Sequence, residues 1–204
     1  MIITLNQAGR RFNQDWIFRN INLKFTSPGK YAVLGPNGSG KSTLLNLLMG
    51  CLSPSEGDIK FEEGVAIPID QVYKHISFAG PYLDLVEEFT LLETIDFHFK
   101  FKEFYPGVDS NAVLDILGLG ASKDKALKYF SSGMKQRTKL ALACCSNTSM
   151  LILDEPTSNL DRQGVSWYHE LIKDFTNNRL VFVGSNQEEE YAFCHDFIQI
   201  TDFK

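Results

Sequence analysis

The chain has 204 residues, 44% of them hydrophobic, which suits one domain with a substantial core. Its formal net charge is −5, and its lysines and arginines are scattered, so composition gives no electrostatic basis for a nucleic-acid partner. The longest strongly apolar stretch, Leu44–Leu52, is far shorter than the about 20 residues that cross a bilayer, and Met1–Leu5 lacks the features of a secretory signal. We therefore expect a chain that is made and kept in the cytoplasm.

The cysteines and histidines indicate neither a disulfide framework nor a metal site. The four cysteines fit no paired spacing, and the four histidines are isolated from one another. Cys144 and Cys145 lie in an apolar run, so we expect them to be buried thiols in a reducing compartment.

Strand-like runs alternate with helical patterns along the chain, which predicts an α/β fold with a mainly parallel sheet. In chain order, the predicted strands are Ile2–Asn6, Ile21–Phe25, Lys30–Leu34, a short antiparallel Asp58–Phe61, His75–Phe78, Met150–Leu153, Leu180–Val183 and Phe197–Ile200. The predicted helices are Lys41–Met49, Leu91–Phe104, Asn111–Leu117, Gly133–Cys145, Arg162–Asn177 and Glu188–Phe193.

The middle of the chain, from Tyr82 to Ser146, has helices without intervening strands, as a helical arm inserted into a single α/β domain of residues 1–204 would have. Aromatic residues crowd its first predicted helix: Phe97, Phe99, Phe101 and Phe104. They either pack within the arm or form a surface on which a partner docks, because exposed aromatic residues favour interfaces.

A glycine-rich segment between a predicted strand and a predicted helix matches the phosphate-binding pattern G-x-x-x-x-G-K-[ST] without a gap. Its glycines let backbone N–H groups approach phosphate oxygens, and the helix N-terminus adds a partial positive charge. Lys41 can reach the terminal phosphates, and the Ser42 hydroxyl can coordinate Mg²⁺. The predicted nucleotide-binding residues of this segment are Gly35, Pro36, Asn37, Gly38, Ser39, Gly40, Lys41, Ser42 and Thr43.

Two acidic residues, Asp154 and Glu155, end the apolar strand that begins at Met150. In open α/β sheets the carboxyl ends of the strands meet the ligand, so Asp154 is placed to hold the metal directly or through water. Glu155 is the better candidate for accepting a proton from attacking water, an acid that a small-molecule kinase does not need. The sequence thus predicts Glu155 and Lys41 as catalytic residues, and Ser42 and Asp154 as metal ligands.

Two further segments flank the acidic strand. Before it stand Ser131, Ser132, Gly133 and Met134 at the start of a predicted helix, and after it come Ser158, Asn159, Leu160 and Asp161. From Phe12 to Asn186, the order of motifs resembles the ABC ATPase superfamily: a Walker A loop, an LSGGQ-like signature, a Walker B strand with its glutamate, and a D-loop. The resemblance implies an α/β P-loop NTPase of ABC ATPase type, with a small antiparallel β part and the inserted helical arm.

The resemblance also implies a partner subunit, ATP and Mg²⁺. In the family, the signature contacts the γ-phosphate of ATP bound to the opposite subunit, so two head-to-tail copies would enclose two ATP molecules, most simply as a homodimer. The Ser131 hydroxyl and the backbone N–H groups that follow it can form that second anion-binding helix terminus. Family members usually stack an aromatic residue on adenine just before the second strand. Phe12 is the preferred match, with Trp16 in the same loop, or a plain core role for Phe12, as alternatives.

Two family positions are substituted. A glutamine that touches Mg²⁺ usually follows the strand ending near Ala79, and the nearest match here is Pro81, which has no side-chain donor or acceptor. A histidine that contacts the γ-phosphate is replaced by Asn186, which can donate a hydrogen bond but cannot carry charge. Hydrolysis either persists with Asn186 as a neutral contact, which we favour, or becomes slow.

The favoured function is the ATP-hydrolysing subunit of an ABC transporter, peripheral on the inner face of the cell membrane, which powers a separately encoded transmembrane permease. One alternative is an ATP-gated regulatory or mechanical module with slow turnover. Another is a soluble ABC ATPase acting on nucleic acid or ribosomes, which the acidic charge and the single cassette disfavour. A small-molecule kinase would leave the signature and D-loop segments without a role.

Overall fold

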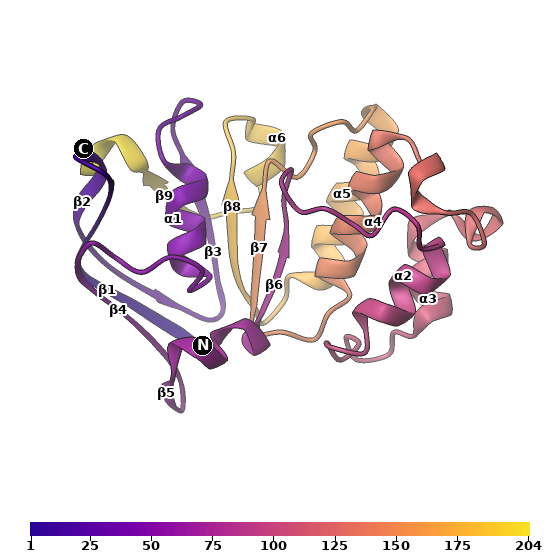
Figure 1. Cartoon of the computed structure of the whole chain (residues 1–204), viewed down its shortest axis with the longest axis horizontal. Coiled ribbons are helices and arrows are strands. Elements are labelled where there is room, and N and C mark those ends of the chain that lie inside the picture. Colours follow the sequence, from indigo (N-terminus) through magenta and orange to yellow (C-terminus); the bar gives the residue numbers. More distant parts are fainter. The chain divides into compact units, whose positions relative to one another are not determined.

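The computed structural model describes residues 1–204 and divides into two compact units (Figure 1). The first unit comprises Met1–Ile76, Ser149–Glu155 and Asn178–Lys204. The second unit comprises Ser77–Thr148 and Pro156–Asn177. The chain therefore passes between the units several times, so neither unit is a continuous stretch of sequence.

An antiparallel sheet forms one part of the first unit. Its strands are β1 (Ile2–Phe12), β2 (Asp15–Thr26), β4 (Glu56–Glu63) and β5 (Val65–Ile67), in the order β2-β1-β4-β5. The first three are longer than predicted, and β5 was not predicted. The β1–β2 register shifts between Leu5 and Ala8, where Gln7 has a φ of 47°. Such a bulge interrupts the alternation of apolar residues while the strand continues beyond it, which explains the underestimated lengths.

A parallel sheet forms the other part of the first unit. Its strands run in the order β7 (Met150–Asp154), β8 (Leu180–Gly184), β3 (Gly29–Leu34) and β9 (Asp196–Gln199). Every residue of β7 and β8 is buried, as expected of parallel strands covered on both faces. Helix α1 (Lys41–Leu48) packs against β7 and β8, and the short α6 (Glu188–Tyr191) follows β8. Strand β6 (Ile76–Ala79) carries the chain into the second unit.

Four helices build the second unit: α2 (Leu91–His98), α3 (Ser110–Leu117), α4 (Ser132–Cys144) and α5 (Arg162–Phe175). Each has a polar N-cap whose side chain accepts a backbone N–H, which satisfies a donor that the first turn leaves unpaired. The N-caps are Thr90, Asp109, Ser131 and Asp161. None of the helices in the structure is long and apolar enough to span a bilayer.

The helix predicted over Leu91–Phe104 ends at His98, so that prediction was too long. Beyond it the chain turns back, and Phe104 pairs with Ser146 in an isolated β-bridge. This turn brings the rings of Phe99 and Phe104 into a stack with centroids 3.7 Å apart. The aromatic residues therefore follow a folded-back segment rather than a continuous helical face.

Candidate functional site

The loop between β3 and α1 has the tight geometry that the phosphate-binding pattern requires. Gly35 and Gly40 have φ values of 148° and 112°, a region that residues with a Cβ rarely adopt. A Cβ on Gly40 would lie 2.4 Å from Cγ2 of Ile17, and one on Gly35 would lie 2.7 Å from Oγ of Ser39. Glycine is therefore needed at both positions, and α1 begins directly afterwards at Lys41.

The first two residues of α1 point their side chains at the loop and at the end of β7. The Lys41 ammonium donates to the carbonyl of Gly35 at 2.9 Å and lies 3.4 Å from that of Pro36. The Ser42 hydroxyl donates to Oδ2 of Asp154 at 2.6 Å, across 112 positions of sequence. The predicted phosphate lysine and the two predicted metal ligands thus belong to one cluster in the first unit.

Asp154 has the environment of a carboxylate that fits a metal ion. It is 4% exposed, and its Oδ1 is buried without a hydrogen-bond partner. Burial raises the pKa of this carboxyl above its usual value, the hydrogen bond from Ser42 lowers it, and the charge of Glu155 raises it further. A hydroxyl beside a desolvated carboxylate is a donor set that suits Mg²⁺, which takes oxygen ligands. Ser42 and Asp154 therefore fit the predicted metal.

Glu155 follows Asp154 in an uncommon backbone conformation. Its φ is 45°, in the left-handed region, and its N–H donates to the carbonyl of Gly184 at 2.8 Å. Non-glycine residues held in this region concentrate at functional sites, where the surrounding structure compensates for the strain. Here the compensation is the hydrogen bond to the end of β8, which fixes the predicted general base next to the predicted metal ligand.

Asn186 also reaches the phosphate loop. It is exposed in the turn after β8, and its Nδ2 donates to Oδ1 of Asn37 at 2.8 Å. The amide at the position of the family histidine thus lies beside the predicted nucleotide-binding residues, although its proposed contact with phosphate stays a prediction.

Phe12 ends β1 with its ring 45% exposed, and the Arg10 guanidinium lies 4.7 Å from the ring centroid. The alternative platform, Trp16, has the guanidinium groups of Arg11 and Arg19 within 5.5 and 4.2 Å of its ring. Arginine guanidinium groups therefore lie beside both candidate rings. Adenine stacking on Phe12 stays a prediction.

The signature and D-loop segments are brought together within the second unit. Ser131 caps α4 by accepting the N–H of Met134 at 3.2 Å, and Ser131 and Ser132 are both exposed. A Cβ on Gly133 would lie 2.9 Å from the carbonyl oxygen of Asn159, so the two segments approach closely. Asp161 caps α5 through the N–H of Gly164 at 2.7 Å, while Ser158 and Leu160 complete the D-loop segment beside it.

Sequence reasoning missed several residues that shape these sites. Ile17 packs against Gly40, and a Cβ on Gly184 would lie 2.8 Å from Oδ1 of Asp154. Glu190 is buried within α6 and accepts a hydrogen bond from Ser185. A glycine ending a fully apolar strand was a usable signal for Gly184, whereas three consecutive glutamates gave no sign that the third is buried.

Pro81 is the nearest match to the family glutamine, and a lysine lies beside its backbone. The Lys139 ammonium of α4 lies 3.4 Å from the carbonyl oxygens of Gly80 and Pro81. The proline itself offers no side-chain ligand, as its chemistry requires.

A mixed α/β fold with a glycine-rich loop between a strand and a helix defines the class of P-loop nucleotide-binding proteins. Within that class, the ABC transporter family model matches residues 18–158, and the chain belongs to this family of transporter ATP-binding proteins. The family identification made from the motifs is therefore confirmed.

Curated relatives cover nearly the whole chain. The energy-coupling factor transporter ATP-binding protein EcfA1 of Thermotoga maritima is 32% identical over 207 residues, which span 97% of this chain and 77% of that protein. The lantibiotic transport ATP-binding protein SrtF of Streptococcus pyogenes is 29% identical over 97% of this chain and 85% of its own length.

Solved structures confirm the predicted ABC ATPase fold. A putative ABC transporter ATP-binding protein from Pyrococcus furiosus aligns over the full length of both chains with a TM-score of 0.83 at 20% identity. The bacterial ABC transporter cassette MJ0796, solved as a dimer, aligns over 97% of this chain and 94% of its own with a TM-score of 0.80 at 22% identity.

Proposed function

We propose that the chain is the ATP-binding and ATP-hydrolysing subunit of a transporter, and that it drives a separately encoded transmembrane permease from the inner face of the membrane. The observation that carries this proposal is the bonded pair of Ser42 and Asp154, 2.6 Å apart behind the phosphate loop, with one buried carboxylate oxygen left without a partner. Burying a carboxylate oxygen without a hydrogen-bond partner costs folding free energy, whereas a Mg²⁺–phosphate site needs such an oxygen as a ligand.

Hydrolysis is assigned to residues of the first unit. Backbone N–H groups of residues 35–40 and the Lys41 ammonium hold the phosphates, because both place positive charge where phosphate oxygens lie. Ser42 and Asp154 would hold Mg²⁺, which would supply charge neutralisation at the phosphates. Glu155 takes the proton from the attacking water, and its backbone hydrogen bond to Gly184 keeps the carboxylate at the end of β7.

Pairing with a second copy is supported by the second unit. Ser131 and Ser132 are exposed at the N-terminus of a 13-residue helix, where the first N–H groups and the helix dipole favour an anion. A phosphate held by another subunit can reach this terminus. The dimeric structure of the MJ0796 cassette, which shares the fold, supports the pairing of two copies.

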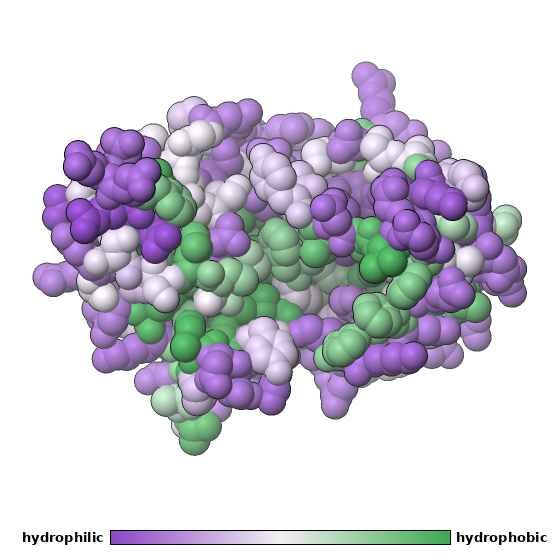
Figure 2. Space-filling model, viewed as in Figure 1, coloured by the Kyte–Doolittle hydropathy of each residue, from purple (hydrophilic) through white to green (hydrophobic).

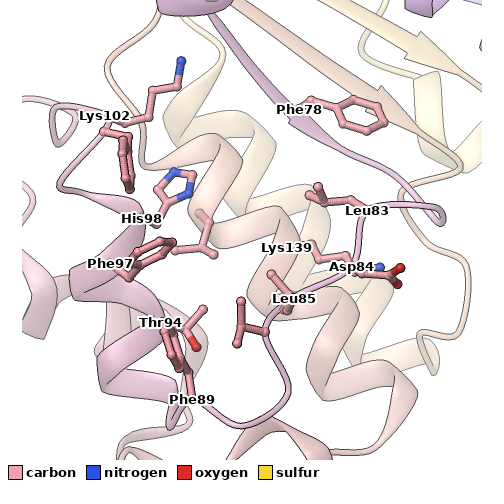
Figure 3. Close-up of a pocket in the computed structure, with 13 residues that line it drawn as sticks. Phe78, Leu83, Asp84, Leu85, Phe89, Thr94, Phe97, His98, Lys102 and Lys139 are labelled. Atoms are coloured by element: carbon pink, nitrogen blue, oxygen red, sulfur yellow. The ribbon is translucent and has the colours of Figure 1, made fainter.

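An apolar groove in the second unit supports docking of the permease. Its volume is about 310 Å³, and Leu83 and Leu85, from the segment after β6, face Phe97 of α2 across it (Figure 3). Figure 2 shows apolar side chains gathered on this face over α2. Lys102 and Lys139 add positive charge against the single Asp84. A short amphipathic segment with an acidic side chain, supplied by a membrane subunit, matches this lining.

Turnover is tested with Glu155→Gln. The exchange keeps the size of the side chain but removes its basicity, so we expect kcat for Mg²⁺-dependent ATP hydrolysis to fall by about 10³-fold or more while ATP still binds. Phosphate release and the affinity for a fluorescent ATP analogue are measured on both proteins. Turnover that survives the exchange would show that Glu155 is not the base.

Docking is tested by affinity capture of the tagged chain from detergent-solubilised native membranes, with and without ATP. We expect a multi-span membrane protein to co-purify, and Phe101→Glu to abolish its recovery, because Phe101 lines the groove and is 72% exposed. Tyr129→Glu, at a 64% exposed aromatic residue outside the groove lining, is the matched control and should retain the partner. Recovery of soluble partners alone, such as ribosomes, would exclude the transporter role.

Two substitutions favour the alternative of an ATP-gated module with slow turnover. Asn186 cannot donate a proton or carry charge, and Pro81 provides no metal contact. Single-turnover rates compared with ATP-driven dimer formation separate the two: fast dimerisation with turnover slower than about one per minute would assign the chain to a gated module.

A further inference from the structure

We infer that Asn37 is a positioning residue for Asn186, and that the two side-chain amides act as one unit through which the turn after β8 reads the terminal phosphate. This inference rests on the proposed ATP hydrolysis and adds to it a function for an exposed residue of the phosphate loop. The two asparagines are 149 positions apart in sequence and meet through a 2.8 Å hydrogen bond.

The geometry leaves a donor for phosphate. An asparagine amide nitrogen carries two N–H groups, and the hydrogen bond to Oδ1 of Asn37 uses one of them. The second N–H of Asn186 remains to donate to a phosphate oxygen held by the neighbouring loop. Because Asn186 is neutral, it contributes direction rather than charge, and Lys41 supplies the charge.

Without a partner, the Asn186 side chain would be poorly defined. It is exposed, and rotation about its last bond would turn either the oxygen or the nitrogen toward the phosphate. The carbonyl oxygen would repel a phosphate oxygen. In the structure, Oδ1 of Asn37 accepts from Nδ2 of Asn186, and this contact holds the nitrogen of Asn186 toward the loop. Asn37→Ala removes the contact and frees the Asn186 amide to rotate.

The backbone behind Asn186 is already fixed by buried groups. Ser185 is fully buried, its N–H donates to the Val33 carbonyl at 3.2 Å, and its Oγ accepts the Gln187 N–H at 2.8 Å. The same hydroxyl donates to the carboxylate of Glu190, which is 1% exposed. These bonds hold the residues on both sides of Asn186, so only the rotation of its exposed side chain is left for Asn37 to determine.

The amide pair also connects the two parts of the hydrolytic site. Gly184, at the end of β8, accepts the N–H of Glu155 at 2.8 Å, and the turn continues directly to Asn186. Gly184 therefore holds the backbone of the proposed base, and Asn186, two residues later, contacts the phosphate loop. Loss of the amide pair should lower kcat, because the phosphate contact is misaligned, and should leave ATP affinity nearly unchanged.

A double-mutant cycle tests the inference through kcat of ATP hydrolysis. We expect Asn37→Ala and Asn186→Ala each to lower kcat about tenfold, and the double variant to lower it by about the same factor, because both remove one coupled unit. KM for ATP should stay within about twofold in all three. Asn111→Ala, which truncates an exposed asparagine of α3, is the matched control and should leave kcat unchanged.

Asn186→His separates a positioning role of Asn37 from a structural one. An imidazole N–H has only one donor direction per ring nitrogen and does not depend on amide orientation, so Asn37→Ala should cost less than about twofold in this background. A tenfold loss that persists there, or single-variant losses that multiply to about 100-fold, would overturn the inference alone. Absence of hydrolysis by the unaltered chain would instead overturn the proposed function and the inference with it.

Discussion

Two buried charged residues of the first unit contrast with the exposed residues by which the second unit is proposed to recognise other chains. In the first unit, Asp154 is 4% exposed, and Lys41 is also 4% exposed. In the second, the signature serines are exposed, and Phe101 of the groove is 72% exposed. Buried groups are positioned by the fold of their own unit, whereas exposed helix termini and apolar grooves are completed by another molecule. On the proposed function, the first unit carries the residues for hydrolysis and the second carries those for recognition of other chains.

The largest expected effect concerns the buried carboxylate of the first unit. Asp154→Asn should lower kcat by about 10³-fold, because the proposed Mg²⁺ site would lose its anionic ligand. The same exchange should raise Tm in Mg²⁺-free buffer by about 2–4 °C, because burial raises the pKa of Asp154 and so makes its charged form unfavourable in the folded protein. Phosphate release and thermal unfolding measure the two effects.

The control for Asp154→Asn is the Mg²⁺·ATP-dependent rise in Tm, which should shrink in the variant. A variant that loses both activity and Mg²⁺-free stability would contradict a functional role for the buried carboxylate. It would mean that Asp154 stabilises the fold as an ordinary core hydrogen-bond acceptor.

An intermediate effect is expected at the exposed signature of the second unit. Gly133→Ala places a Cβ 2.9 Å from the carbonyl oxygen of Asn159, so the start of α4 or the D-loop must shift. We expect kcat to fall by about 10–100-fold while the monomer binds ATP normally, because the nucleotide site lies in the other unit. Gly120→Ala, where a Cβ would meet nothing within 4 Å, is the matched control and should retain full turnover.

The dependence of turnover on protein concentration tests whether the second unit acts on another copy of the chain. If the signature acts on a second copy, turnover should rise more than linearly with protein concentration in the unaltered chain, and the variant should lose that dependence. A loss of ATP affinity in the dilute variant would contradict the division of roles between the units.

The sequence predicts a feature correctly where residues adjacent in sequence determine it. The phosphate loop, the acidic end of β7 and the cap of α4 could be predicted because each is set by residues adjacent in sequence. The end of α2 and the continuation of β1 past Gln7 could not, because a fold-back near Phe99 and a bulge depend on distant partners. The Asn37–Asn186 contact was equally hidden, since its residues meet only after β3 and β8 pair.

A last effect, on stability rather than on turnover, concerns a titrating group beside the groove of the second unit. Burial lowers the pKa of His98 to about 4, with the charge of Lys102 as a further cause. Its Nε2 lies 2.9 Å from the Ser146 hydroxyl, which donates its proton to the Leu142 carbonyl. The neutral ring therefore donates from Nε2. Burial disfavours the charged ring, and this outweighs the hydrogen bond with the Leu142 backbone, which favours it.

Stability should consequently fall as the pH is lowered. An unfolded histidine binds a proton near pH 6.5 and the folded one only near 4, so the unfolded state binds more protons within this window. The contribution of neutral His98 to the free energy of unfolding should be fully present above pH 6.5. The free energy of unfolding should then decline by up to about 3 kcal/mol as the pH falls toward 4. Urea titrations at several pH values measure this decline, and His98→Gln should flatten it. An equal decline in the variant would assign the pH dependence to other groups and would show that His98 is not held neutral by its surroundings.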